Sequence, residues 1–459
     1  MKRILIFNGH ARTPNRWGMF GEVIKRLQES PDNDIYYLDC NSAIKTPCGL
    51  NKSHHWGYCN KCNKPCLKLL KYINFDESHI LKMSKVNKEN FPNFKSIKEA
   101  LMYNKDGYNY GLAAVSVIMT LTRDYNFEIK KWNNTIKKFF QTEYTVFKNL
   151  EHFMKTYNFD EIHTFNGRMP VMYPCVEFAR KNNINYVVYE SGAKINHLLV
   201  IKNKVPHDFN FRKQELKVSF ENKNIKMEEK VNLANKWFKD RRAGKFQAME
   251  SFTKDQIKDF LPKDFDISKE NIVFFNSSID EVYAFDSWKH PFAENENEIL
   301  EKLFEHYKND ENKHFYLRIH PNLTKAKKKH ATQIKQINKM KKKYKNLTVI
   351  EPDDKIDTYA LMEVCDKVLS TYSTTAFEAT YWGKVAIIAG IAPYEDLDCV
   401  YKANSMEEFY NLIDDKNLTP KAKENTYPYA YNLETYGEKY RYYKPESRKQ
   451  GNFLGMSLK

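Results

Sequence analysis

Short apolar runs alternate with longer amphipathic stretches along most of the chain. In the first half, the apolar runs predict strands at residues 3–7, 34–38, 161–165 and 185–190. Stretches with apolar residues at helical spacing predict helices at residues 18–29, 97–103, 110–122 and 132–157. Strands that alternate with helices are typical of a parallel sheet covered by helices. The first half is therefore predicted to be one α/β domain with an inserted, cysteine-bearing segment.

The alternation stops between about residue 202 and residue 270, where charged helical sequence such as "EEKVNLANKWFKDRRAG" takes over. It restarts at Asn271 with five strand-like runs: "NIVFFN", "HFYLRI", "LTVIE", "KVLST" and "VAIIA". A chain of 459 residues is also too long for one ordinary core. We predict an N-terminal domain (1–205), a helical linker (206–270), a second α/β domain (271–415) and a tail (416–459) that packs back on the N-terminal domain. Two such domains in tandem usually bind a ligand in the cleft between them.

The formal charge of +16 is compatible with nucleic acid, an anionic membrane or anionic small substrates. Much of the excess is Lys scattered among Asn, which is typical of solvated surface, and no nucleic-acid-binding module is recognised. We therefore predict no nucleic-acid partner. The lysine runs at residues 325–330 and 339–345 are interpreted most simply as a solvated face, and they can also contact anionic lipid at about 1 kcal/mol per residue.

The hydropathy of the sequence predicts neither a signal peptide nor a transmembrane helix. "MKRILIF" is followed at once by Asn8 and Gly9, which predicts a strand and not a signal peptide. The longest apolar stretch, residues 111–121, is shorter than the ~20 residues that span a bilayer. We expect a cytoplasmic protein that is at most peripheral to the inner membrane.

A group of cysteines raises the question of a metal. Thiolates at C-x2-C-x3-C spacing with one Cys upstream can bind zinc, and His54 and His55 are nearby. Structural zinc sites usually pair two short Cys knuckles, however, and here one Cys stands alone. A cytosolic setting argues against disulfides. We predict no metal and leave structural zinc open for the following residues: Cys48, Cys59, Cys62 and Cys66.

Polar residues follow three predicted strands of the second domain. "NSSIDE" follows "IVFF", "RIHPN" follows "FYL", and "STYSTT" follows "KVL". In an open parallel sheet the ligand lies beyond the carboxyl ends of the strands, so each set is predicted to contact it. The predicted binding residues are Ser277, Ser278, Arg318, Pro321, Ser370, Ser373, Thr374, Thr375 and Glu378.

The hydroxyl-rich segment directly precedes a predicted helix, "TAFEATYWG". Ser373, Thr374 and Thr375 are therefore expected at its cap and first turn, where unpaired NH groups and the helix dipole favour an anion. A plain cap needs one hydroxyl, whereas this segment has five in six residues, so phosphate binding is preferred over capping. Glu378 either completes a capping box or accepts hydrogen bonds from ribose hydroxyls.

His320 is the strongest candidate for catalysis. An imidazole beside a rigid proline can donate to a leaving phosphate oxygen, either as a general acid or as a fixed positive charge. Strand alternation places Arg318 on the same face, two residues earlier. A structural His is the alternative.

The first domain also has polar strand ends. Asn166 and Arg168 follow one strand, and Glu190 ends the next. Arg168 offers a bidentate grip on a carboxylate or phosphate, and Glu190 can accept a proton from a sugar hydroxyl. A salt bridge between Arg168 and Glu190 is the alternative. In the first loop, three residues are predicted to contact the acceptor substrate: His10, Arg12 and Arg16.

"YLRIHPN" followed by "LSTYSTTAFEATYWGK" resembles the donor-side motifs of bacterial capsule and surface polysaccharide glycosyltransferases, a group that includes the Kdo transferases of capsule assembly. Bacterial sialyltransferases have similar His-Pro and Ser-Ser/Thr motifs. "FNGR", "YESG" and "GYNYGLAAVSVI" look like the first-domain pattern of such proteins. The resemblance covers most of residues 1–400.

The resemblance implies a GT-B architecture, with two Rossmann-type domains facing a central cleft, the donor nucleotide in the second domain and the acceptor in the first. The His-Pro motif falls on His320 and Pro321, and the hydroxyl motif on Ser373, Thr374 and also Ser370. GT-B enzymes typically need no divalent ion, so no metal or cofactor is implied besides the nucleotide sugar. The Asp/Glu-Asp/Glu-Gly motif of sialyltransferases is missing, and Glu190 is only a loose substitute for its base.

We therefore predict a metal-independent glycosyltransferase that moves a sugar from a nucleotide donor to a capsule polysaccharide or glycolipid acceptor. A CMP-linked acid sugar such as Kdo is preferred over UDP or GDP sugars. Teichoic-acid polymerases have a similar Arg-x-His-Pro segment, so transfer of a polyol phosphate is an alternative. A non-catalytic scaffold of capsule export is another. An anionic inner-membrane surface is a further expected partner.

Overall fold

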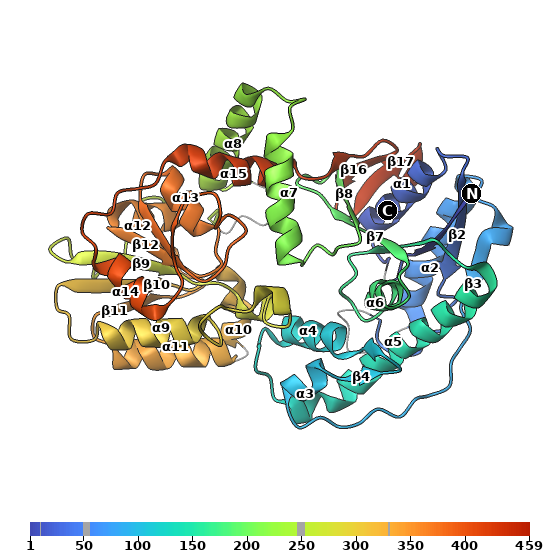
Figure 1. Ribbon diagram of the computed structural model, residues 1–459, viewed down its shortest axis with the longest axis horizontal. Helices are drawn as coiled ribbons and strands as arrows, with labels where there is room; N and C mark the ends of the chain where they lie inside the picture. Colours follow the sequence, from blue (N-terminus) through green and yellow to red (C-terminus); the bar gives the residue numbers. More distant parts are fainter. Residues whose placement is uncertain (10, 49–55, 246–252, 329–330) are drawn as a thin grey trace. The chain divides into compact units, whose positions relative to one another are not determined.

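The computed structural model describes residues 1–459 apart from 10, 49–55, 246–252 and 329–330. The chain divides into two compact units (Figure 1). Unit 1 contains residues 1–121, 128–208 and 436–459, and unit 2 contains residues 122–127 and 209–435. Each unit is built on its own sheet, so each has its own core.

Unit 1 contains a seven-stranded sheet in the order β15-β8-β7-β6-β1-β2-β3. The strands from β7 to β3 are parallel, whereas β8 and β15 run antiparallel at one edge. Seen from β1, the chain proceeds to β2 and β3 on one side and returns to β6 and β7 on the other. The strands of this sheet are β1 (Lys2–Phe7), β2 (Asn33–Asp39), β3 (Ile80–Lys82), β6 (Glu161–Phe165), β7 (Asn185–Ser191), β8 (His197–Lys202) and β15 (Glu438–Lys439).

Helices cover both faces of this sheet. Ile4 and Ile6, two residues apart on β1, point into the same cluster as Phe20 of α1 and Leu69 of α2, as strand alternation requires. On the other face, α6 packs on β6 and β7 and is itself packed by α5. The helices of unit 1 are α1 (Pro14–Leu27), α2 (Trp56–Tyr72), α3 (Ile97–Leu101), α4 (Gly111–Thr122), α5 (Ile129–Tyr157) and α6 (Tyr173–Lys181).

Glu22 of α1 anchors the C-terminal segment to unit 1. Its fully buried carboxylate accepts hydrogen bonds from the backbone NH groups of Arg441 (2.7 Å), Tyr442 (2.8 Å) and Tyr443 (2.9 Å). The Tyr443 ring lies so close to Gly18 that a Cβ atom at that glycine would be 2.3 Å from it. Charge-assisted hydrogen bonds and close packing thus hold together residues more than 400 positions apart.

The segment held by Glu22 forms small antiparallel pairings beyond β15. It contains β16 (Tyr443–Ser447), β17 (Gln450–Phe453) and β18 (Met456–Leu458). The strands β16 and β17 pack against α1, and Phe453 and Leu458 join the cluster of α1 and α2. A short pairing of β4 (Asn104–Lys105) with β5 (Tyr108–Asn109) lies elsewhere in unit 1.

Unit 2 contains a six-stranded, fully parallel sheet in the order β11-β10-β9-β12-β13-β14. In chain order this is 3-2-1-4-5-6, the order of a Rossmann sheet. The strand order reverses between β9 and β12, which lie side by side. The strands are β9 (Glu270–Phe275), β10 (Lys313–Arg318), β11 (Leu347–Ile350), β12 (Lys367–Ser370), β13 (Val385–Ala389) and β14 (Tyr401–Ala403).

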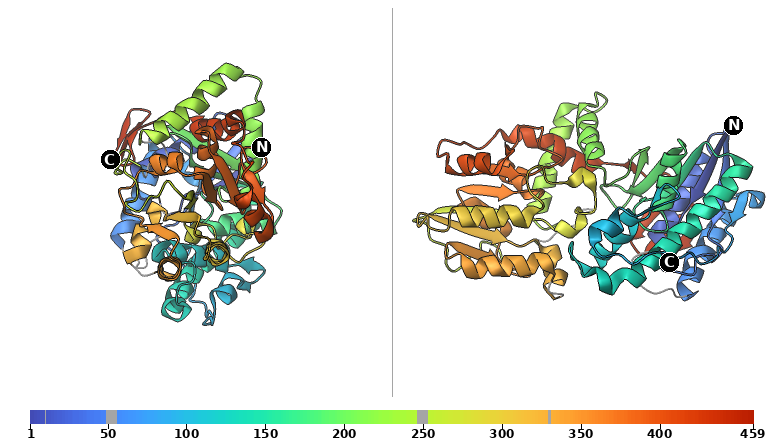
Figure 2. Two further views of the ribbon diagram at one scale, coloured as in Figure 1. Left: turned by 90° about the vertical axis from the view of Figure 1, so that its left-hand side faces the viewer. Right: turned by 60° about the horizontal axis from the view of Figure 1, so that its bottom comes forward.

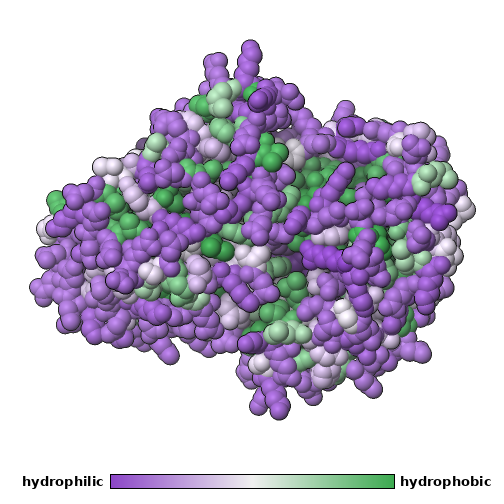
Figure 3. Space-filling view, in the orientation of Figure 1, coloured by the Kyte–Doolittle hydropathy of each residue, from purple (hydrophilic) through white to green (hydrophobic). Residues whose placement is uncertain are grey.

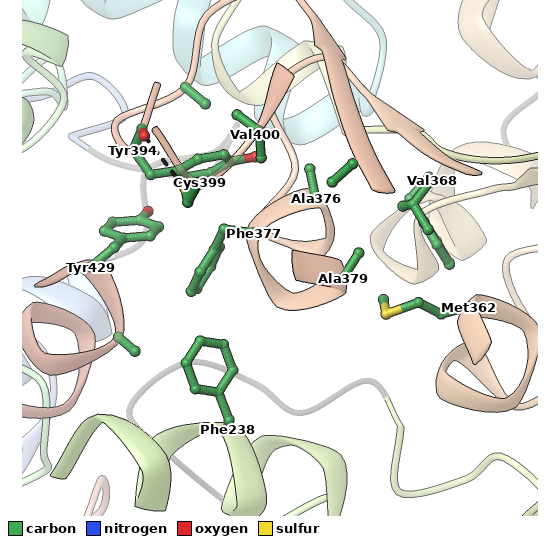
Figure 4. Packing of buried hydrophobic residues seen from close by; sticks show 14 of the residues in the cluster. Phe238, Met362, Val368, Ala376, Phe377, Ala379, Tyr394, Cys399, Val400 and Tyr429 are labelled. Atoms are coloured by element: carbon green, nitrogen blue, oxygen red, sulfur yellow. Dashed lines mark hydrogen bonds between the residues drawn. The ribbon is translucent and has the colours of Figure 1, made fainter. Parts of the chain in front are cut away.

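Helices lie on both faces of this sheet (Figures 1 and 2). Alternate strand residues contribute to two apolar layers, one on each face. Ile272 and Phe274 of β9 face one layer, with α9, α11 and α14, whereas Val273 and Phe275 face the other, with α8, α12, α13 and α15. Phe377 of α13 points into this second layer near Phe238 of α8 (Figure 4). The helices are α7 (Phe209–Glu221), α8 (Met227–Arg242), α9 (Glu296–His306), α10 (Thr324–Lys328), α11 (Thr332–Lys343), α12 (Thr358–Val364), α13 (Thr375–Tyr381), α14 (Met406–Asp414) and α15 (Tyr427–Thr435).

The predicted α/β class is confirmed by the two parallel sheets, and the strands predicted from apolar runs are present. The boundaries differ. Residues 206–270 were expected to be a linker, but α7 and α8, within residues 209–270, pack against α15 inside unit 2, because their apolar residues join its core. The tail is divided: residues up to 435 belong to unit 2 and residues from 436 to unit 1. A cleft between the two units stays a prediction.

The surface is mainly hydrophilic on the face that Figure 3 shows. At the end of α11, Lys341 lies 3.4 Å from Glu351 and Lys343 lies 2.7 Å from Glu305, so part of this lysine run pairs with the unit's own carboxylates. This agrees with a solvated face. Among the described helices, none combines the length and the apolar character needed to cross a membrane.

We predict that Glu22→Ala lowers the free energy of unfolding by about 3 kcal/mol, because one buried and two partly buried NH groups lose their acceptor. Urea denaturation measures the loss, and limited proteolysis should show faster cleavage within residues 436–459. The matched control is Glu29→Ala, since Glu29 contacts Arg441 and Tyr442 from an exposed position and should matter little. Equal stability of Glu22→Ala and wild type would show that Glu22 does not anchor this segment.

Candidate functional site

Three of the predicted polar segments lie at one edge of the unit 2 sheet. They follow β10, β9 and β12, which are parallel neighbours, so their carboxyl ends share that edge. The edge includes the point where the strand order reverses. In sheets of this kind, ligands bind outside the carboxyl ends at the reversal.

Direct hydrogen bonds fix these strand ends relative to one another. The side-chain oxygen of Asn276, after β9, accepts a 2.6 Å hydrogen bond from the His320 backbone NH, after β10. The hydroxyl of Ser370, at the end of β12, donates to the Phe275 carbonyl of β9 (3.1 Å). The edge is therefore pre-organised by the protein itself.

His320 is a neutral imidazole in this setting. Burial lowers its pKa to about 4, and the positive charges of Arg241, Arg123 and Arg318 act in the same direction. Its Nδ1 atom accepts a 3.1 Å hydrogen bond from the Asn322 backbone NH, so the proton of the neutral ring resides on Nε2. Of the two predicted roles, a fixed positive charge is therefore not available near pH 7 without a ligand, whereas an Nε2–H donor is.

Arg318, the last residue of β10, brings a buried charge to the same edge. It is 3% exposed, and its two terminal nitrogens donate to the backbone carbonyls of Glu351 (3.3 Å) and Asp354 (3.1 Å). Burial lowers its pKa to about 10, so the guanidinium stays charged near neutral pH. Among the described residues, its Nε atom and the Nδ2 atom of Asn276 are buried donors without an acceptor.

The hydroxyl segment after β12 is largely satisfied by local contacts. The Ser373 NH donates to the Ser370 hydroxyl (3.1 Å), and the Thr375 NH donates to the Ser373 hydroxyl (3.3 Å). Thr374, at the cap of α13, makes no side-chain capping bond. Two of the amides that were predicted to face a phosphate are thus engaged by the chain's own hydroxyls.

Glu378 is buried within unit 2. Its carboxylate accepts hydrogen bonds from the hydroxyls of Tyr359 (2.6 Å) and Thr374 (3.0 Å), and one oxygen lies 3.6 Å from Nε of Arg241. Thr374 and Glu378 thus form a side-chain version of the expected capping contact. The same carboxylate positions Arg241, one of the cations around His320.

Ser278 and its neighbours form a charged group beside the β9 end. The Ser278 hydroxyl donates to Asp280 (2.8 Å), and Arg123 lies 3.2 Å from both Asp280 and Glu281. Arg123 comes from residues 122–127, which belong to unit 2 although the flanking helices belong mainly to unit 1. Arg123 is distant in sequence from Asp280 and Glu281, so only folding brings it to the site.

Glu296 links two strand-end loops, although no sequence pattern pointed to it. One oxygen accepts a hydrogen bond from the Ser277 NH (2.8 Å), and the other contacts the Thr371 hydroxyl. Burial raises the pKa of this carboxyl to about 7, against the hydrogen bonds from Thr371 and Ser277. As the first residue of α9, it ties the β9 and β12 loops to one helix.

Unit 1 has polar residues at the corresponding edge of its own sheet. The Glu190 carboxylate accepts from the Asn166 amide (2.6 Å) and from the Ser191 NH (2.9 Å). Arg168 instead donates to Thr120 of α4 (2.9 Å), so the Arg168–Glu190 salt bridge considered from the sequence does not form. These partners place Asn166 with Glu190, but hold Arg168 against α4.

The other predicted acceptor residues are less defined. Arg12, in the loop after β1, is partly buried. His10 lies outside the described residues, as do His54 and His55 near the cysteine group.

Three of the grouped cysteines occupy one face of α2, at spacings of three and four residues. Burial raises the pKa of Cys66 to about 12 and that of Cys62 well above its usual range, which favours neutral thiols. Within the described ranges, no group of three or more His, Cys, Asp or Glu side chains is arranged to hold a metal. Zinc at Cys48, Cys59, Cys62 and Cys66 was left open, and it stays open.

The sequence matches no protein-family model and no curated protein. Among solved structures, the β-Kdo 2,4-transferase KpsC of Thermosulfurimonas dismutans matches with 12% identity over 60% of this chain and 80% of that chain, at a TM-score of 0.39. The β-Kdo 2,7-transferase KpsC of the same organism matches with 14% identity over 62% and 80%, at 0.36. A putative UDP-N-acetylglucosamine 2-epimerase of Listeria monocytogenes matches with 10% identity over 96% and 93%, at 0.27. Scores in this range define neither family nor function.

We predict that His320 titrates with a pKa of about 4, well below the usual 6.5, and that its neutral form is the Nε2–H tautomer. Because the folded pKa is depressed, this group stabilises the fold above about pH 6.5, and that contribution is lost as the pH falls towards 4. Imidazole ¹⁵N NMR measures both properties.

The Arg241→Gln variant should raise the His320 pKa, because it removes a nearby positive charge. Arg242→Gln is the matched control, since the Arg242 guanidinium pairs with Glu363 at 2.5 Å and should leave His320 unchanged. A wild-type pKa near 6.5 would contradict the assignment.

Proposed function

We propose that the protein is a glycosyltransferase that moves a sugar from a nucleotide-activated donor to a capsule or other surface polysaccharide acceptor. The proposal places the donor phosphate at the β10-β9-β12 edge of unit 2. It rests on the motifs around His320 and Ser373 and on the charges around them. It does not draw on the structural matches, whose scores are too low.

One observation carries the proposal. A neutral His320 lies in the field of three guanidinium groups after β10, the strand next to the reversal point of a Rossmann-ordered sheet. Two buried donors of the described chain, Arg318 Nε and Asn276 Nδ2, have no acceptor there. Buried donors and cations of this kind are costly unless an acceptor is bound, and a phosphate supplies both charge and acceptor oxygens.

In the proposed reaction, protein groups neutralise the negative charge that develops on the leaving phosphate. As the bond between the anomeric carbon and the phosphate oxygen breaks, that oxygen takes the electron pair, and the Nε2–H of His320 donates to it. The negative charge also offsets the three guanidinium groups, which raises the His320 pKa and brings proton transfer within reach. We propose that these groups act in place of a divalent ion.

The acceptor is proposed to bind unit 1. Its hydroxyl oxygen attacks the anomeric carbon, and the proton passes to a base, for which Glu190 is the proposed group. Glu190 is held by Asn166 and Ser191, which fixes the carboxylate in one orientation. A CMP-linked acid sugar is the preferred donor, and peripheral contact with an anionic membrane is part of the same proposal.

A polyol-phosphate transferase would use the same phosphate-binding edge, because its leaving group is also a nucleotide. The two reactions differ in the product. Mass analysis of the acceptor shows added phosphorus only for the second, so this measurement decides between them.

We predict that CMP stabilises the full chain more than UDP or GDP does. At about 100 times its dissociation constant, a ligand of the folded state adds about 2.7 kcal/mol to the free energy of unfolding. Thermal unfolding with each nucleotide at equal concentration measures the effect. No stabilisation by any nucleotide would remove the donor site from the proposal, and it is the result expected of a scaffold.

We predict that His320→Ala slows transfer by about 100-fold, equivalent to ~3 kcal/mol, as for loss of one oxyanion donor. Donor affinity should change little, because the guanidinium groups remain. His314→Ala is the matched control, since His314 lies near the opposite end of the same strand and hydrogen bonds to Thr348. Unchanged turnover in His320→Ala would contradict the proposed role of His320 as donor to the leaving phosphate oxygen.

A further inference from the structure

We infer that unit 1 carries a subsite for the anionic group of a sugar, with Arg16 as its cation. The inference rests on the proposed function only where it identifies this sugar as the acceptor. The subsite itself follows from the placement and partners of Arg16.

Arg16 lies at the reversal point of the unit 1 sheet. It belongs to the first turn of α1, which begins shortly after β1, and β1 is the neighbour of β6 in the sheet. Its guanidinium carbon is 3.1 Å from the ring centroid of Phe165, the last residue of β6. The cation thus lies against the carboxyl end of a central strand, where sheets of this order bind ligands.

Arg16 has no carboxylate in direct contact among the described residues. It forms no ion pair at 4.0 Å or less within them, and its Nη1 atom is buried without a hydrogen-bond partner. Burial lowers its pKa, while Glu190, Tyr189 and Tyr440 act in the opposite direction. A buried guanidinium normally recruits a carboxylate, because an unpaired buried charge is strongly unfavourable.

Arg26, on the same helix, shows the usual arrangement. Its guanidinium lies 2.7 Å from Glu22 and 2.7 Å from Glu438. Near Arg16, by contrast, the carboxylate of Glu190 is engaged by Asn166 and Ser191. Arg26 is thus paired directly with two carboxylates, whereas Arg16 makes no such ion pair within the described residues and keeps its buried Nη1 donor for an external anion.

The groups around Arg16 define the chemistry of the ligand. Glu190 is hydrogen-bonded to Asn166, the residue after Phe165. Tyr440 directly precedes Arg441, whose NH group binds Glu22 of the same helix as Arg16. The Tyr440 hydroxyl is a second buried polar group without a partner in the described chain. The cation and the phenol suit a carboxylate or phosphate, whereas Glu190 suits a sugar hydroxyl. An acidic sugar satisfies all three groups, whereas a neutral sugar offers Arg16 no anionic partner.

Ligand-observed NMR on the full chain tests the inference with three probes: glucuronate, glucose 6-phosphate and glucose. We expect at least one acidic probe to bind wild type about tenfold more tightly than glucose, and to lose about tenfold in Arg16→Gln. Tighter binding of glucuronate would identify a carboxylate as the preferred anionic group, and tighter binding of glucose 6-phosphate would identify a phosphate. Lys25→Gln is the matched control, because it removes one positive charge from the same helix.

Arg16→Gln should keep the fold, since the partly buried Arg16 makes no ion pair at 4.0 Å or less within the described residues. Thermal unfolding of the variant checks this, so weaker binding would not reflect unfolding. Equal binding to wild type and Arg16→Gln, or no acidic probe bound better than glucose, overturns the inference. CMP stabilisation of Arg16→Gln should equal that of wild type. If wild type does not bind CMP but binds an acidic probe in an Arg16-dependent way, the proposed function is refuted and the anion subsite stands.

Discussion

The reversal of strand order between β9 and β12 is the constraint on which the candidate site of unit 2 depends. The helix after β9, α9, packs on one face of the sheet, and the helix after β12, α13, packs on the other. The two connecting loops therefore diverge at the carboxyl edge, and their polar groups need partners. Ser370 binds the end of β9, and Glu296 bridges both loops. These contacts keep the edge ordered while the loops separate.

Electrostatics distinguishes this edge from an ordinary loop cluster. Arg318 is held by backbone carbonyls, which satisfy its hydrogen bonds but carry no net charge. Arg241 and Arg123 are drawn in by buried carboxylates, Glu378 and Asp280. Burial, and then the combined field of these three arginines, keeps His320 neutral. The hydrogen-bond donor His320 is therefore surrounded by positive charges. This arrangement suits a bound group whose negative charge increases during the reaction.

The strand ends could be predicted from the sequence because period and polarity are local: Arg318, His320 and Ser370 follow apolar runs that have few alternatives to a buried strand. Which hydroxyls satisfy one another could not, because Ser373 and Thr375 depend on the backbone path before α13. Arg241 lies in a charged helix that looked like a linker, and Arg123 in a loop between helices of the other unit. Such residues join the site through tertiary packing, which leaves no periodic signal.

The anchoring of residues 441–443 by Glu22 affects the order in which the polypeptide can mature on the ribosome. Unit 2 is complete in sequence at residue 435, whereas unit 1 acquires its edge strand β15 and the partners of Glu22 only from the segment that follows. During translation, the Glu22 carboxylate of the N-terminal α/β core therefore has Arg26 as a partner but lacks its three backbone NH donors. Vectorial synthesis would let the second unit finish first, although the first begins the chain.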